Sequence, residues 1–138
     1  MRIRGINGKD CDISPWAYME LQAFCRQYDE KKERAADLLY RAGGKLTGMP
    51  RGSNTSDPVC ITTVIRDRLL RDCELIEAAA KEADPAGYEA ILRNVTQGIP
   101  YEQCGYRGAK SPFFRARKKF FLLLYQQRWR ELGAMRSG

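Results

Sequence analysis

Apolar residues recur at alternating steps of four and three over residues 17–38, the spacing of one face of an α-helix. The stripe is interrupted only at Lys31. Ser14 followed by Pro15 is typical of a helix start, because serine caps free N–H groups and proline fits the first turn. Together with a glycine pair after residue 42, the pattern predicts one helix over about residues 14–42.

A second stripe of the same kind runs from Ile61 to Ala80 and predicts a helix over about residues 58–83. The segment 43–57 is rich in glycine, serine and proline, which is typical of a flexible loop. Two amphipathic helices joined by one loop most simply form a long antiparallel hairpin. We therefore expect residues 1–83 to form a helical arm.

The rest of the chain, residues 84–138, divides into shorter helical pieces. Asp84-Pro85 predicts the start of a third helix, which ends at Gly98, and a short helix follows from Pro100. Ser111-Pro112 predicts the start of a last helix that extends to about Leu132. Alternation of apolar and polar residues, the mark of a strand, is missing. The fold class expected is all-α, a hairpin arm followed by a small unit with the proportions of a helix-turn-helix.

Basic residues concentrate at the C-terminal end. The chain carries a formal net charge of +7, and residues 107–136 contain nine Lys or Arg and one acid, Glu131. A localised basic segment is the electrostatic mark of a protein that binds a polyanion. The alternative is a core helix with a solvated basic back. The coincidence of a turn, a helix start and the charge at one place favours binding.

Spacing gathers several of these side chains at the start of the last helix. Arg115, Lys118 and Lys119 stand three and four residues apart and share a helix surface. Residues of the preceding turn and the first free N–H groups of the helix can also hold phosphates. The residues predicted on these grounds are Arg107, Lys110, Ser111, Arg115, Lys118 and Lys119. Bulky residues 112–114 favour phosphate contacts over base reading.

The sequence gives little support for catalysis, metal binding or membrane insertion. The chain has no histidine, and its five cysteines (Cys11, Cys25, Cys60, Cys73 and Cys104) form no closely spaced pair. We therefore expect no metal site, no cofactor and no enzyme activity. Met1 to Asp12 lacks the apolar core of a signal peptide, and no apolar run is long enough to span a membrane. A cytoplasmic location in a bacterial host cell, without membrane contact, is expected.

The stretch YEAILRNVTQGIPYEQCGYRGAKSPFFRARKKFFLLL resembles the sigma-70 region 4-like helix-turn-helix of phage-encoded transcriptional regulators, the late-gene activator type. The connector KLTGMPRGSNTSDP is similar to the loop between two N-terminal helices of those proteins. The resemblance implies binding to duplex DNA and contact with host RNA polymerase or another host protein complex. It also implies that Tyr101, Glu102 and Gln103 belong to the scaffold helix, and that Arg117 joins Ser111, Arg115, Lys118 and Lys119 on the recognition helix.

Two other functions remain open from the sequence. One is a small phage protein that binds and inhibits a host protein or nucleoprotein complex. The other is a small-terminase-like DNA packaging subunit, since helical hairpins can oligomerise. The sequence is compatible with a monomer or a dimer.

Overall fold

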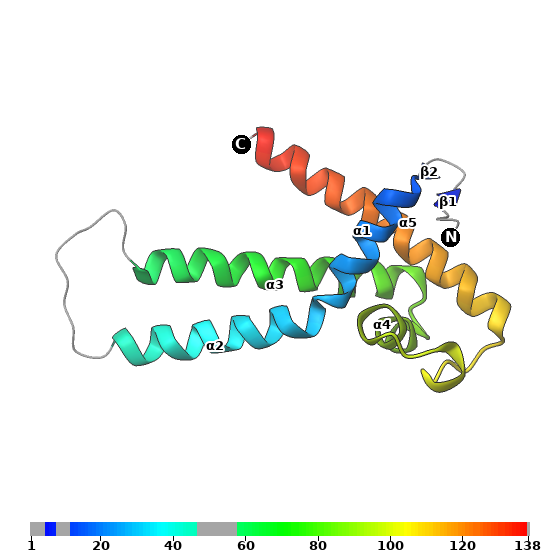
Figure 1. The fold of residues 1–138 in the computed structure, drawn as a ribbon, viewed down its shortest axis with the longest axis horizontal. Coiled ribbons are helices and arrows are strands. Elements are labelled where there is room, and N and C mark those ends of the chain that lie inside the picture. The colour runs from blue at the N-terminus through cyan, green and yellow to red at the C-terminus, as the bar shows by residue number, and fades with distance from the viewer. Residues whose placement is uncertain (1–4, 8–11, 47–57, 138) are drawn as a thin grey trace. The chain divides into compact units, whose positions relative to one another are not determined.

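The computed structural model describes residues 5–7, 12–46 and 58–137 (Figure 1). Over these residues the chain forms five α-helices, one short 3₁₀ helix and a pair of two-residue strands, so the predicted all-α class is confirmed. The strands, β1 (Ile6–Asn7) and β2 (Asp12–Ile13), pair antiparallel and were not predicted. They are too short to show the alternation that identifies a strand in a sequence.

The helix predicted over 14–42 is two helices in the structure. α1 spans Pro15–Arg26 and α2 spans Tyr28–Leu46, with a turn at Gln27 between them. Ser14 caps α1 as expected, its hydroxyl accepting the N–H of Ala17 at 3.2 Å. α2 continues through the glycine pair that was expected to end it, and the remaining part of the predicted loop, 47–57, lies outside the described residues.

Two compact units divide the chain, and they differ from the division expected at residue 84. Unit 1 joins Met1–Gln27 to Leu75–Gly138, and unit 2 is Tyr28–Glu74. α3 (Pro58–Ala83) begins in unit 2 and ends in unit 1. The N-terminal helix α1 therefore belongs with the C-terminal helices rather than with an arm.

Unit 2 consists of α2 beside the first part of α3 (Figure 1). Lys31, which interrupts the apolar stripe, pairs with Asp72 at 3.0 Å, and Arg68 lies 3.3 Å from the other oxygen of the same carboxylate. Burying a charge is tolerated only when it is paired, and this pair holds the two helices at one register. Ile61 and Ile65, predicted to be part of the buried face of the second stripe, are exposed.

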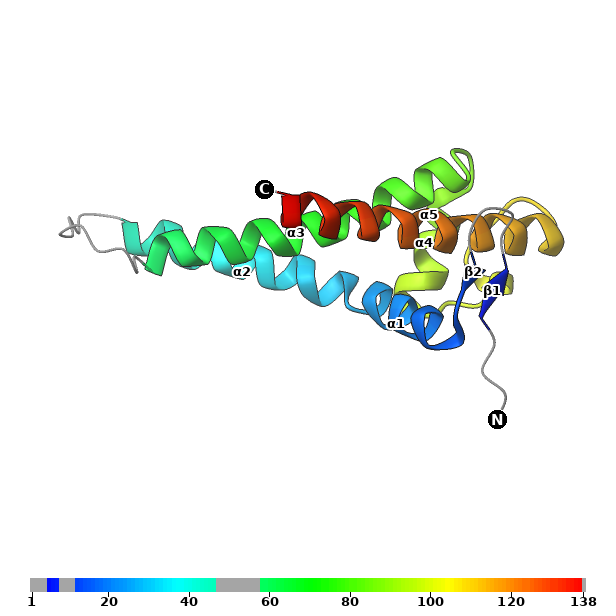
Figure 2. The ribbon, with the colours of Figure 1, turned by 90° about the horizontal axis from the view of Figure 1, so that it is seen from above.

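Unit 1 carries most of the buried apolar side chains of the described residues. α1 packs against α4 (Tyr88–Gln97) and against α5 (Lys110–Ser137), and α4 also contacts α5 (Figure 2). The three largest wholly buried side chains among the described residues, Phe113, Phe120 and Phe121, come from α5, which also buries Leu124. Phe121 meets Tyr18 of α1 edge to face, with ring centroids 5.1 Å apart. The basic helix α5 is thus anchored by its aromatic side.

Candidate nucleic-acid interface

The segment between α4 and α5 positions the predicted site. α4 ends at Gly98, whose φ of 73° is left-handed and suits glycine. A 3₁₀ helix, η1 (Tyr101–Gln103), follows in place of a full scaffold helix. Gly105, with a φ of 84°, then turns the chain toward α5. The order of elements is the one predicted, but the middle helix is a single 3₁₀ turn.

Side chains of α4 and η1 fix this connection by bonding to its backbone. Asn94 donates to the carbonyl of Ile99 at 2.9 Å, and Arg93 donates to the carbonyl of Cys104 at 2.8 Å. The Tyr101 hydroxyl donates to the carbonyl of Gly108 at 2.9 Å. The segment that leads into α5 is therefore held in one conformation by three side chains.

The third helix starts later than predicted, because Asp84 caps a turn rather than the helix. One Asp84 oxygen accepts the N–H of Gly87 at 3.0 Å, and the other accepts the Tyr106 hydroxyl at 2.9 Å. Residues 85–87 form that turn, and α4 begins at Tyr88. Burial and the bond to Asp84 raise the pKa of Tyr106 above its ordinary value, because both disfavour the phenolate.

Four of the predicted residues line one shallow hollow at the start of α5. The hollow has a volume of about 600 Å³, within the range of small-ligand sites, and it is open to solvent. Its lining consists of Lys110, Ser111, Phe114, Arg115 and Lys118. We call this surface the α5 hollow. Lys119 is exposed one residue further along the helix.

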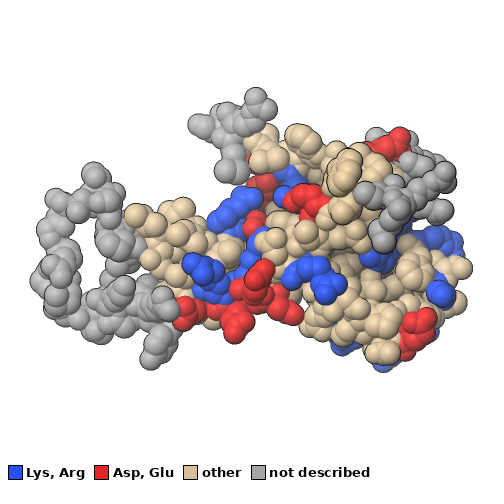
Figure 3. Space-filling model, viewed as in Figure 1, with Lys and Arg blue, Asp and Glu red and all other residues tan. Residues whose placement is uncertain are grey.

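No acid stands near these charges in the sequence. The sequence from Gln103 to Arg130 contains neither Asp nor Glu, and the first turn of α5 has no acidic residue. At the right of Figure 3 separate basic side chains lie on a largely uncharged surface with one acidic group below them, whereas over α2 and α3 basic and acidic side chains are interspersed. The α5 hollow is therefore an electropositive surface at a helix start, where the backbone dipole adds to the side-chain charge.

Arg117, also predicted on this surface, does not line the α5 hollow; with Phe114 and Lys118 it lines a neighbouring hollow, where its guanidinium is bonded within the fold. Its Nε donates to Asn94 Oδ1 at 2.6 Å, and one terminal nitrogen donates to the Tyr18 hydroxyl at 2.8 Å. The guanidinium also lies 4.9 Å from the centre of the Phe121 ring. Arg117 therefore ties α5 to α1 and α4, a structural role that its neighbours do not share.

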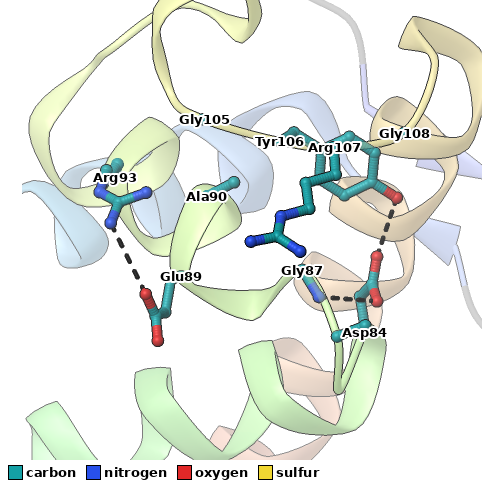
Figure 4. A pocket seen from close by; sticks show the side chains of 10 residues that line it. Asp84, Gly87, Glu89, Ala90, Arg93, Gly105, Tyr106, Arg107 and Gly108 are labelled. Atoms are coloured by element: carbon teal, nitrogen blue, oxygen red, sulfur yellow. Dashed lines mark hydrogen bonds and ion pairs between the residues drawn. The ribbon is translucent and has the colours of Figure 1, made fainter.

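Arg107 lies in a separate cleft of about 580 Å³, lined by residues of α4 and of the turn that follows η1. In Figure 4 its side chain extends into this cleft, toward Gly87 and Ala90. Arg93 lies on the other side and pairs with Glu89 at 3.6 Å (Figure 4). Because Asp84 and Glu89 also line the cleft, its charge is mixed, and Arg107 is apart from the uniformly basic α5 hollow.

Sequence reasoning missed Phe114 as part of the surface. Phe113 is fully buried, whereas the adjacent Phe114 is 43% exposed and lies among the basic side chains of the α5 hollow. Consecutive helical residues point about 100° apart, so only one of the two can face the core centre. The spacing of Phe114 from Lys118 (i, i+4) was the signal that places both on one surface.

Comparisons with known proteins do not assign this chain to a family. No family model, no curated protein and no solved structure matches it. Among the described residues no cluster of His, Cys, Asp and Glu could hold a metal ion. None of the helices, within the described part of the chain, is long and apolar enough to cross a membrane.

Proposed function

We propose that this protein binds DNA through the α5 hollow, mainly by contacts to phosphates. The single observation that carries the proposal is the gathering of Lys110, Arg115 and Lys118 around one hollow with no acid in it. Lys119 adds a fourth cation beside them. Such a surface supplies the sequence-independent part of DNA affinity, because binding releases the counterions condensed on the phosphates.

The role that follows from the family resemblance is that of a phage-type transcriptional regulator, sigma region 4-like. The order α4, η1, turn and α5 supports it, since a recognition helix follows a turn and is held by the helices before it. The brevity of η1 and the aromatic residues at the start of α5 favour docking on the backbone over direct reading of bases.

A salt series tests DNA binding directly. With four cations at phosphates, the logarithm of the binding constant for a generic duplex should fall with the logarithm of salt concentration at a slope of about −3.6. Fluorescence anisotropy between about 50 and 200 mM salt measures it. A folded protein that binds no DNA even at the low end would refute the proposal.

A charge-matched pair of variants locates the surface. Replacing Lys110, Arg115 and Lys118 with glutamine should reduce the slope by about three-quarters, because about three phosphate contacts are lost. Replacing Lys32, Arg34 and Arg71, which are exposed residues of α2 and α3, with glutamine removes the same net charge elsewhere. If both triple variants weaken binding equally, net charge rather than the α5 hollow accounts for affinity.

A second candidate function is docking on a host protein, and the end of α5 supports it. Trp129 is 58% exposed, Leu132 is also exposed, and Tyr125 lies against the Trp129 ring. Aromatic residues flanked by arginine are typical of the side chains that dominate protein interfaces. Titration with purified bacterial RNA polymerase would test this: Trp129→Ala should weaken that binding and leave DNA affinity unchanged.

A packaging subunit, the third candidate, must assemble into a ring or another higher oligomer. Light scattering of the purified protein distinguishes it from a monomeric or dimeric regulator.

A further inference from the structure

Phe114 is an exposed aromatic ring among basic side chains. This combination indicates a ligand that offers more than phosphate groups. A single exposed apolar residue is ordinary on a protein surface. Here, however, the ring lines the same hollow as Lys110, Arg115 and Lys118, and covering these charges with an apolar surface that lacks acids would remove their hydration without compensation. The partner that fits must present a flat apolar face and negative charge together.

The ring is held in place by other aromatic side chains. Its centroid lies 5.1 Å from that of the buried Phe113, nearly perpendicular to it, and 6.4 Å from that of Tyr101. Tyr101 is itself fixed by its bond to Gly108 and by contact with Phe113, 5.3 Å between centroids. A ring braced in this way loses little freedom on binding and offers a preorganised flat surface.

Phe114 and Lys118 form a ridge between two hollows, because both residues line each of them. One is the α5 hollow. The other, of about 310 Å³, lies between α5 and the N-terminal strands and is also lined by Gly5, Ile6, Tyr18 and Arg117. A chain molecule crossing the ridge would place one group on the ring and its neighbours in the hollows on either side.

We propose that Phe114 is the stacking platform for an unstacked nucleobase, with Lys110, Arg115 and Lys118 holding the phosphates that flank it. The proposal rests on the DNA binding proposed above and specifies the form of DNA preferred. Nucleobases carry a π-face and adjoin phosphates, so they match both the ring and the cations. In a regular duplex each base is already stacked on its neighbours, and an inserted apolar side chain must first unstack a step. An unpaired base, in a bulge or a single strand, avoids that cost.

Anisotropy with three fluorescent DNAs of equal length tests the preference: a perfect duplex, the same duplex with one bulged thymine, and a single strand. Stacking on one aromatic ring changes affinity by about 5- to 150-fold. We expect the bulged duplex to bind more tightly than the perfect duplex by a factor in this range. The single strand shows whether the base alone or its duplex setting is recognised.

Variants at Phe114 distinguish stacking of a base on the aromatic ring from a contribution of apolar side-chain volume. Phe114→Ala and Phe114→Leu should both lose the preference for the bulge, since leucine keeps apolar volume without a π-face, while Phe114→Trp should keep it. The readout for each variant is the ratio of its affinities for the bulged and the perfect duplex, because the phosphate contacts contribute to both. Circular dichroism checks that each variant is folded; if alanine unfolds the protein, the leucine and tryptophan variants still decide the question.

Photocrosslinking gives the location of the base. A 5-iodouracil at the bulged position should crosslink to Phe114, identified by mass spectrometry of the tryptic peptide. Equal affinity for all duplexes, or a bulge preference that survives Phe114→Leu, would overturn the stacking proposal while leaving DNA binding intact. A protein that binds none of the three DNAs overturns both proposals and favours a protein partner at this surface.

Discussion

Arg117, Lys118 and Lys119 follow one another in the sequence but have different surroundings. Arg117 bonds to Asn94 and Tyr18, Lys118 lines the α5 hollow, and Lys119 is exposed. Their charges are the same, so their different roles come from the 100° turn of the helix between residues. Charge alone therefore does not identify which basic side chains of α5 are available to a ligand.

Replacing Arg117 should test this difference. Arg117→Gln removes charged donors from Asn94 and Tyr18, and we expect the free energy of unfolding to fall by about 2–3 kcal/mol. Lys119→Gln, the matched control on the exposed side, should change it by less than about 0.5 kcal/mol. Urea denaturation followed by circular dichroism measures both. Equal stability of the two variants would show that the bonds of Arg117 contribute little.

The same pair should behave in the opposite way toward DNA. Lys119→Gln should make the salt dependence of binding shallower by about one phosphate contact, whereas folded Arg117→Gln should leave the slope unchanged. A slope altered by Arg117→Gln alone would return Arg117 to the binding surface.

Tyr106 gives the fold a dependence on alkaline pH. Its pKa is raised by burial and by the bond to Asp84, so the folded state retains the proton where the unfolded chain has lost it. The stabilisation from this group is complete below the unfolded pKa of about 10 and is lost as pH rises through the higher folded value.

Comparison with Tyr106→Phe isolates that contribution. At pH 8 the variant should be less stable by about 1–2 kcal/mol, the contribution of a bond to a carboxylate. The difference should shrink above pH 10, because the unaltered protein loses the phenol proton and the variant has none to lose. Urea titrations from pH 8 to pH 11 measure it. A difference that stays constant over this range would contradict the assignment.

At the scale of elements, helix ends that depend on local chemistry were predictable. The start of α1 follows from the serine hydroxyl at residue 14, and the end of α4 follows from the left-handed Gly98. The break at Gln27 has no glycine or proline to mark it, and it falls where unit 1 gives way to unit 2. Tertiary packing determines such a break, so the pattern of apolar residues along the sequence does not predict it.

The candidate site, like the helix ends, was predictable from the sequence only in part. Charge and helical spacing were enough to place Lys110, Arg115 and Lys118 on one surface. The inward position of Arg117 was not predictable, because its partner Tyr18 is 99 residues away in the sequence. The exposure of Phe114 likewise depends on which side of α5 the core covers.

Gly98 provides a test of how far local geometry fixes the site. Alanine at this position would be forced into a left-handed conformation, and its Cβ would lie 2.6 Å from a terminal nitrogen of Arg26. Because that nitrogen ends a flexible side chain, backbone strain should dominate, and Gly98→Ala should lower the free energy of unfolding by about 1–2 kcal/mol.

Gly133→Ala is the matched control. Nothing lies within 4 Å of a Cβ at this helical position, and alanine should raise stability slightly, by up to about 1 kcal/mol. Thermal and urea denaturation measure both variants. If the two glycine variants have the same stability, the left-handed cap of α4 is not a strained position.

At the scale of the whole molecule, unit 1 is assembled from both ends of the chain. Its core joins Leu21 and Phe24 of α1 to side chains from α4 and α5. Arg128 of α5 adds an ion pair with Glu20 and lies 4.1 Å from the centre of the Phe24 ring. The basic helix therefore depends on residues that precede unit 2 in the sequence.

This dependence predicts the behaviour of the fragment 84–138, which the sequence pattern alone would treat as an independent helix-turn-helix unit. Without α1, the side of α5 that carries Phe121 loses its cover, and Arg117 loses its bond to Tyr18. A chain of this length also buries too little surface to tolerate such a loss. We expect the fragment to lack a cooperative thermal transition and to bind DNA more weakly than the full chain. Circular dichroism melting and anisotropy measure these two properties. A fragment that melts cooperatively and binds as the full chain does would show that α1 is dispensable for the DNA-binding surface.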